Sequence, residues 1–127
     1  MDGRFLAEGP VDGTALVLAE PLSFWGGLEP TTGEIVEANH PQRGEVVTGR
    51  ILVMPSGRGS SSSATVLAES IRLGTGPAGV VLGEADEIVA IRALVAEALY
   101  GVRTAVFVAS QDDYAAIRDG DHITRLP

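Results

Sequence analysis

The segment Met54–Ser63, of sequence MPSGRGSSSS, combines residue types that bind small anions. Gly57 and Gly59 allow a ligand to approach the backbone closely, because glycine has no side chain and tolerates positive φ. Arg58 can hold a carboxylate or a phosphate through two parallel hydrogen bonds. The serines that follow add hydroxyl donors, and the free N–H groups at the start of a helix would attract the same anion. The segment therefore predicts an anion-binding loop.

The same composition also fits a plain turn that ends in a helix N-cap. The pattern is not the phosphate loop GxxxxGK[ST], because no lysine follows the glycines. It is not the serine elbow GxSxG either, because the serines lack flanking glycines at that spacing. From these residues alone, an anion site and a capped turn both remain open.

The loop lies between a predicted strand and a predicted helix, in a chain whose first half is rich in β-structure. Short apolar segments separated by turn residues predict the strands of this half. They are expected at Thr14–Leu18, Glu34–Glu37 and Glu45–Met54. Gly49, inside the last of them, indicates a bulge.

Helices and strands alternate in the second half. Apolar residues spaced three to four apart predict a helix from about Ser61 to Leu73, followed by Gly74 as its C-terminal glycine, and a second helix over Glu84–Tyr100. The apolar face of the second helix is expected to consist of Ile88, Ile91, Leu94, Val95 and Leu99. Further strands are expected at 79–82, 104–109 and 122–126, with a short helix or turn at 112–118. This order predicts one α/β domain with three layers over residues 1–127.

Composition limits the classes of function. A net charge of -8, from 17 acidic and 9 basic residues, opposes binding to nucleic acid. The chain has no cysteine and only two histidines, His40 and His122, so we expect no metal site within it. Its apolar runs are far shorter than the roughly 20 residues that span a bilayer, and no signal peptide is recognisable. The sequence therefore predicts a cytoplasmic protein that binds neither nucleic acid nor membrane.

Several segments resemble the small subunit of aconitase X, in the same order along the chain. They are Pro21–Gly33 (PLSFWGGLEPTTG), Asn39–Pro41 with Gly44, Gly49–Ser61 (GRILVMPSGRGSS), Gly76–Gly79 and Leu82–Phe107. The similarity covers about Leu16 to Leu126. It implies a swivelling β/β/α domain like that of the aconitases, here as a separate chain. It also implies a large aconitase X subunit as the partner, which holds an iron–sulfur cluster.

The family assigns the catalytic base to a serine of this loop. Carried over to this chain, the base is Ser60, with Ser61 or Ser62 in its place if the register differs by a step. Arg58, Gly59 and the two later serines are then expected to bind the substrate.

The resemblance implies a hydro-lyase subunit that dehydrates a small hydroxy acid and is active only with its partner. The expected substrate is cis-3-hydroxy-L-proline. The alternatives are a phosphomevalonate dehydratase small subunit and a stand-alone anion-binding domain without catalysis. Two further residues, His40 and Trp25, are expected at the subunit interface or at the rim of the site. A phosphohistidine carrier is discounted, because residues 55–63 contain no histidine.

Overall fold

A computed structural model describes residues 2–22, 27–56, 61–85 and 87–125. The side chains of residues 61–65, 87, 88 and 92 are likewise outside the description. Four expected site residues therefore lie outside the described residues. These are the loop residues Arg58, Gly59 and Ser60, and Trp25. What the structure does define is the framework that holds the two ends of the loop.

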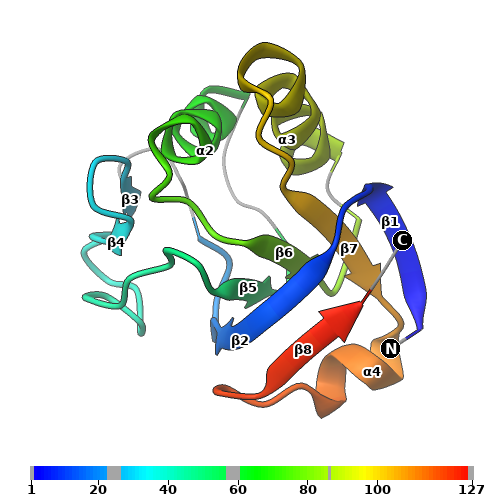
Figure 1. The fold of residues 1–127 in the computed structure, drawn as a ribbon. Coiled ribbons are helices and arrows are strands. Elements are labelled where there is room, and N and C mark those ends of the chain that lie inside the picture. Colours follow the sequence, from blue (N-terminus) through cyan, green and yellow to red (C-terminus); the bar gives the residue numbers. More distant parts are fainter. Residues whose placement is uncertain (1, 23–26, 57–60, 86, 126–127) are drawn as a thin grey trace.

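That framework is a six-stranded mixed sheet with the strand order β1-β7-β6-β5-β2-β8 (Figure 1). The four inner strands are mutually parallel, and each edge strand runs antiparallel to its neighbour. The bounds are β1 Gly3–Ala7, β2 Val11–Val17, β5 Ile51–Met54, β6 Gly79–Leu82, β7 Ala105–Ala109 and β8 His122–Arg125.

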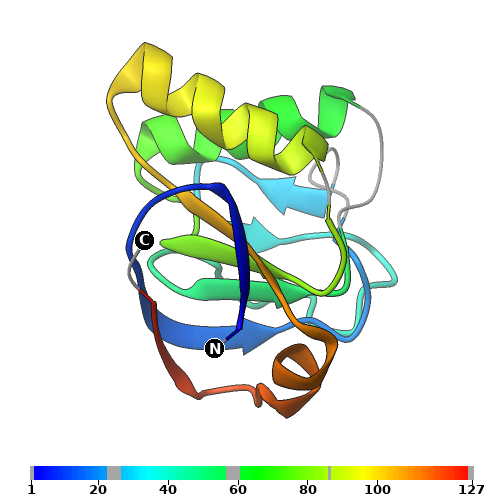
Figure 2. The same cartoon turned by 90° about the vertical axis from the view of Figure 1, so that its right-hand side faces the viewer.

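Two long helices cover one face of this sheet, as the side view shows (Figure 2). They are α2, Ser61–Leu73, which connects β5 to β6, and α3, Glu87–Tyr100, which connects β6 to β7. The short helix α4, Gln111–Ala116, lies at the other side, before β8. A small hairpin of β3, Leu28–Glu29, and β4, Glu34–Ile35, flanks α2.

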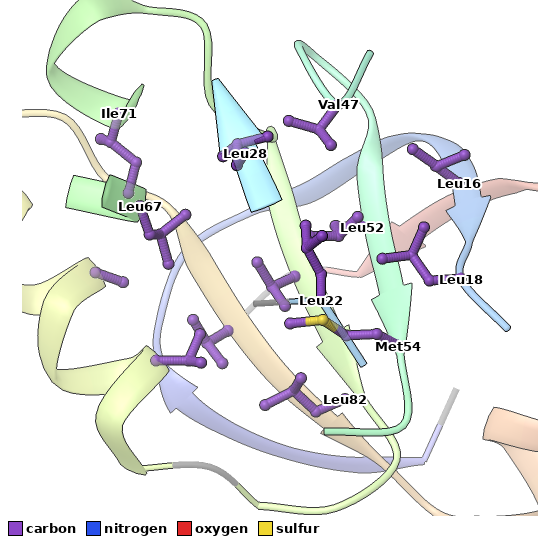
Figure 3. Close-up of a cluster of buried hydrophobic side chains, with 14 of the residues drawn as sticks. Leu16, Leu18, Leu22, Leu28, Val47, Leu52, Met54, Leu67, Ile71 and Leu82 are labelled. Carbon is purple, nitrogen blue, oxygen red and sulfur yellow. The ribbon is translucent and has the colours of Figure 1, made fainter. Parts of the chain in front are cut away.

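Alternating side chains of β5 supply two separate hydrophobic cores. Leu52 and Met54 point toward the helices and pack with residues such as Leu67 (Figure 3). Ile51 and Val53 point to the opposite face and belong to the second core. All four are fully buried, as expected for a central parallel strand that is covered on both faces.

The second core shows that the sheet curves into a half-barrel. It contains Phe107 from β7 together with Ile123 from β8, although these strands are not neighbours in the sheet. Phe5 of β1 meets Phe107 edge to face with the ring centroids 4.9 Å apart, and the Arg125 guanidinium lies 5.6 Å from the centroid of the same Phe107 ring. The two edges of the sheet thus pack over one core, and the predicted α/β class is confirmed.

Most predicted elements are found close to their expected bounds. The helix at Ser61–Leu73 and the strand at 79–82 are confirmed, and Gly74 has a φ of 78°, as a C-terminal glycine requires. Strand β1 was not predicted, since its pairing with β7 joins segments that are about a hundred residues apart. Among the described residues, no helix is both long and apolar enough to span a membrane.

The prediction of one long strand over Glu45–Met54 was wrong. Only Ile51–Met54 is a strand, while Val46 forms a single isolated bridge to Glu34. Gly49 has a φ of 70° and lies in a turn rather than in a bulge, where the N–H of Arg50 donates to the carbonyl of Val47. The turn interrupts the strand because the alternation of apolar residues stops at Thr48–Arg50.

The prediction for the second helix needs two corrections. The helix begins at Glu87 rather than Glu84, because the N–H of Glu84 donates to the Pro55 carbonyl at the end of β5. Three members of its expected apolar face, Ile91, Leu94 and Leu99, are exposed. Val95 is half-buried and the Ile88 side chain lies outside the description. The side chains that α3 buries are Val89, Ala90, Ala93 and Ala96. Small alanine side chains let α3 approach α2 and the sheet closely, and the larger apolar residues are left outside.

Candidate functional site

The expected site lies at one edge of the sheet, where the parallel strands β5, β6 and β7 all end. Because these strands run in the same direction, the segments that follow them start side by side. The loop with Arg58 and Ser60 begins after Met54 and ends where α2 starts at Ser61. Its two ends therefore lie at this edge, which we call the carboxyl edge.

Backbone hydrogen bonds join the ends of β5 and β6 at the carboxyl edge. The Pro55 carbonyl accepts the N–H of Gly83 at 3.1 Å and that of Glu84 at 2.8 Å. A side chain at Gly83 would place its Cβ 3.2 Å from the Pro55 oxygen and 3.3 Å from the ring of Tyr114. Glycine at this position lets the tyrosine ring lie against the turn, so the wall beside the loop is built from three separate segments.

A pocket of about 440 Å³ opens between these segments, and its lining consists of Pro55, Gly83, Glu84, Gln111 and Tyr114. Three of the lining residues carry polar groups, namely a carboxylate, an amide and a phenol hydroxyl. Partial burial raises the pKa of Tyr114 above its usual value, so its hydroxyl remains protonated at neutral pH and can donate a hydrogen bond. The pocket can therefore bind a small polar molecule beside the loop.

Helix α4 holds Gln111 and Tyr114 in place. Its N-cap is Ser110, whose hydroxyl accepts the N–H of Asp113 at 3.3 Å and whose own N–H donates to the Asp2 carbonyl at 2.8 Å. The Asp113 carboxylate accepts the backbone N–H of Asp2, and this hydrogen bond lowers the pKa of Asp113. The start of the chain thus anchors one wall of the pocket.

His40 is buried, with 5% of its surface exposed, and both of its ring nitrogens are hydrogen-bonded within this chain. Its Nδ1 accepts the backbone N–H of Gln42 at 3.0 Å, so the proton is assigned to Nε2, which lies 3.1 Å from the Glu20 carbonyl. Glu20 follows the end of β2, at the carboxyl edge. The ring therefore joins the 37–43 turn to that edge, and its expected place at an interface or rim stays a prediction.

We expect replacement of His40 by alanine to destabilise the isolated chain. The change removes both hydrogen bonds and leaves a cavity, a loss of about 2–5 kcal/mol. Urea unfolding followed by circular dichroism measures it. His122→Ala is the matched control, since that ring is largely exposed and forms a surface pair with Asp12, at 2.8 Å. Equal midpoints for the two variants would contradict the structural role of His40.

Three lining residues were not singled out from the sequence, and they are Glu84, Gln111 and Tyr114. They lie in two segments that are far apart along the chain and carry no recognisable motif. The sequence signal that could have found them is their position, because each residue follows one of two successive parallel strands, and such segments meet at one edge of the sheet. Across the described parts of the chain, no group of three potential metal ligands comes together.

Sequence comparison places this framework among known proteins. The family model of the aconitase X swivel domain matches residues 1–125. Cis-3-hydroxy-L-proline dehydratase of Pseudomonas aeruginosa is 44% identical over 98 residues, which are 77% of this chain but only 17% of that protein. The phosphomevalonate dehydratase small subunit of Methanopyrus kandleri is 48% identical over 84 residues, 66% of this chain and 62% of that subunit.

Solved structures agree with the sequence comparison. Aconitase X of Thermococcus kodakaraensis superposes with a TM-score of 0.82 at 29% identity, over 97% of this chain and 88% of that chain. A UPF0107 protein solved by NMR superposes with a TM-score of 0.83 at 30% identity, over 98% and 89% of the two chains. The half-barrel with its helical layer is therefore the swivelling α/β fold, and this chain belongs to the aconitase X swivel domain family.

Proposed function

We propose that this chain is the small subunit of a two-chain hydro-lyase that dehydrates cis-3-hydroxy-L-proline. The relatives are dehydratases or dehydratase small subunits, which supports the reaction class and a larger partner. The observation that carries the proposal is the position of the two ends of the loop. Its first end follows β5 at the carboxyl edge, where Pro55 lines a pocket of small-molecule size, and its second end is the start of α2.

The partner subunit is proposed to hold the iron–sulfur cluster. The residues of this chain do not fit such a group, because the sequence contains no cysteine to ligate iron. The described residues also bring no three His, Asp or Glu side chains together. The chain's own contribution is therefore substrate binding and proton transfer, while departure of the hydroxyl group belongs to the partner.

Two loop residues are proposed to bind the substrate and to transfer the proton. Arg58 holds the substrate carboxylate through paired hydrogen bonds. Ser60 removes the proton from the carbon next to that carboxylate. For this step Ser60 must start as the alkoxide, and taking up the proton returns it to the neutral hydroxyl. Ser60 directly precedes Ser61, the first residue of α2, along the chain, and the positive end of a helix dipole favours a negatively charged group.

The carboxylate of Glu84 favours hydroxyproline over phosphomevalonate. Both substrates carry a carboxylate, but the first has a ring ammonium group and the second a phosphate. None of the five residues that line the pocket is basic, and Glu84 is an exposed acid within it. An acidic wall attracts the ammonium and repels the phosphate.

The test is co-expression of this chain with the large aconitase X subunit of the same organism. Purified complex is supplied with either substrate, and release of the dehydrated product is followed by mass spectrometry. Turnover of cis-3-hydroxy-L-proline by the complex, and by neither chain alone, is the expected result. Turnover of phosphomevalonate instead would support the alternative substrate. A complex that forms without turning over either compound would favour the non-catalytic anion-binding domain.

Substitution of Glu84 by glutamine tests the substrate preference directly. We expect KM for hydroxyproline to rise about two- to fivefold with a smaller change in kcat, since a screened ion pair is lost and the loop is untouched. Steady-state kinetics of the reconstituted complex measures both constants. Asp112→Asn is the control, because this exposed acid of α4 does not line the pocket. An unchanged KM would remove Glu84 from the substrate site.

A further inference from the structure

Helix α3 carries two apolar stripes on opposite sides. The inner stripe is Val89, Ala93 and Ala96, each at most 4% exposed, and it packs inside the domain. On the other side, Ile91, Leu94 and Leu99 are 53%, 46% and 67% exposed. Leu94 lies three residues and Leu99 eight residues after Ile91, so both flank Ile91 on the side of the helix opposite the inner stripe. We call them the outer stripe.

The outer stripe is unusual for a surface helix. Single exposed apolar residues are common, but a row of large ones on one helix face marks a contact surface. A helix that is apolar on two opposite sides is expected to be covered on both. The nearby acid Glu97 lies beside the row rather than within it, since it is turned away from Ile91 around the helix, and its carboxylate pairs with the Arg103 guanidinium at 2.8 Å.

We propose that the outer stripe is a docking surface for the large aconitase X subunit. The inference rests on the proposed function and specifies how the partner is held. Helix α3 begins at Glu87, immediately after the segment that leaves β6 at the carboxyl edge. A partner that completes the site must contact that edge, and Ile91 lies four residues further along. From Ile91 the stripe continues along α3 for about 12 Å, so the docking surface begins about one helical turn from the carboxyl edge.

A second copy of this chain fits the stripe less well than a larger partner. Each copy carries a net charge of -8, so two copies would repel each other. The relatives point to a larger body instead. The Pseudomonas aeruginosa dehydratase aligns with this chain over only 17% of its own length, and the Methanopyrus kandleri relative is named a small subunit. The surface of the large subunit that fits the outer stripe is an apolar groove with a basic rim. The groove matches the apolar side chains of the stripe, and the basic rim matches the negative net charge of this chain.

The experiment places an aspartate in the outer stripe and measures association with the large subunit. We expect Ile91→Asp and Leu94→Asp each to weaken binding by about tenfold or more, because a charge must then be buried in the contact. The affinity is measured by sedimentation velocity or by titration calorimetry on the purified subunits. Thermal unfolding of the isolated variants should remain close to that of the unsubstituted chain, since both positions are exposed.

The matched control is Val46→Asp, at an apolar side chain that is 41% exposed and lies outside α3. It should bind the large subunit with unchanged affinity. Normal binding by both α3 variants, in a complex that still dehydrates its substrate, would overturn the docking surface and leave the proposed function standing. If the isolated chain forms a homodimer, and Ile91→Asp dissociates it, the stripe belongs to a contact with a second copy. This result would also overturn the docking surface for the large subunit. If the unsubstituted chain neither binds nor activates the large subunit, both proposals fail.

Discussion

Replacement of Ser60 by alanine is expected to lower kcat of the reconstituted complex by a factor on the order of 10² to 10⁴, the range for loss of a general base. The alanine cannot accept the substrate proton, whereas Arg58 and the partner still bind the substrate. KM should therefore change little. Steady-state dehydration of cis-3-hydroxy-L-proline measures both constants, and gel filtration shows that the complex is intact.

The neighbouring serines provide the controls for this substitution. Ser61→Ala and Ser62→Ala keep a serine at position 60 and differ only in register along the same run. If Ser60 is the base, both should retain kcat within about tenfold, because a lost substrate contact is worth about one hydrogen bond. A large loss at Ser61 or Ser62 alone would move the base to that residue. Near-normal rates for all three variants would sink the assignment of a serine base to this loop.

Substitution of Arg58 by lysine is expected to raise KM by about 10- to 100-fold. The positive charge is kept, but one of two parallel hydrogen bonds to the carboxylate is lost, and hydrogen bonds to charged groups are worth about 1.5–3 kcal/mol. Arg58→Ala, which removes the charge as well, should be more severe. Initial rates over a range of substrate concentrations separate the effect on KM from that on kcat.

The control for Arg58 is Arg4→Lys, at an exposed arginine of the edge strand β1. It should leave both constants unchanged. If Arg58→Lys lowered kcat strongly at an unaltered KM, the guanidinium would act in the transition state rather than in substrate binding. Equal kinetics for Arg58→Lys and the unsubstituted complex would remove Arg58 from the carboxylate site.

Local patterns predicted much of the framework. The helix at Ser61–Leu73 and the buried strand at 79–82 were found as expected, because a three-to-four spacing and a short apolar run are decided by nearby residues. The long strand over Glu45–Met54 was wrong because a turn around Gly49 interrupts it. Strand β1 was missed since only its partner β7, about a hundred residues later, gives it a place in a sheet.

The apolar face of α3 shows where local pattern fails. The periodicity of Ile91, Leu94 and Leu99 is real, but the tertiary structure buries Val89, Ala93 and Ala96 instead. Periodicity identifies an apolar stripe and not the surface that covers it. When a helix has two such stripes, packing density favours the one whose small side chains permit the closest approach.

By itself, the sequence determined the α/β class and the lack of thiolate ligands, and it predicted an anion-binding loop around Arg58 and Ser60. These properties depend on residue type and on neighbours along the chain. Only the tertiary structure decided that Pro55, Glu84 and Tyr114 line one pocket at the carboxyl edge. That meeting follows from parallel strand pairing, which joins segments too far apart for any local signal to connect.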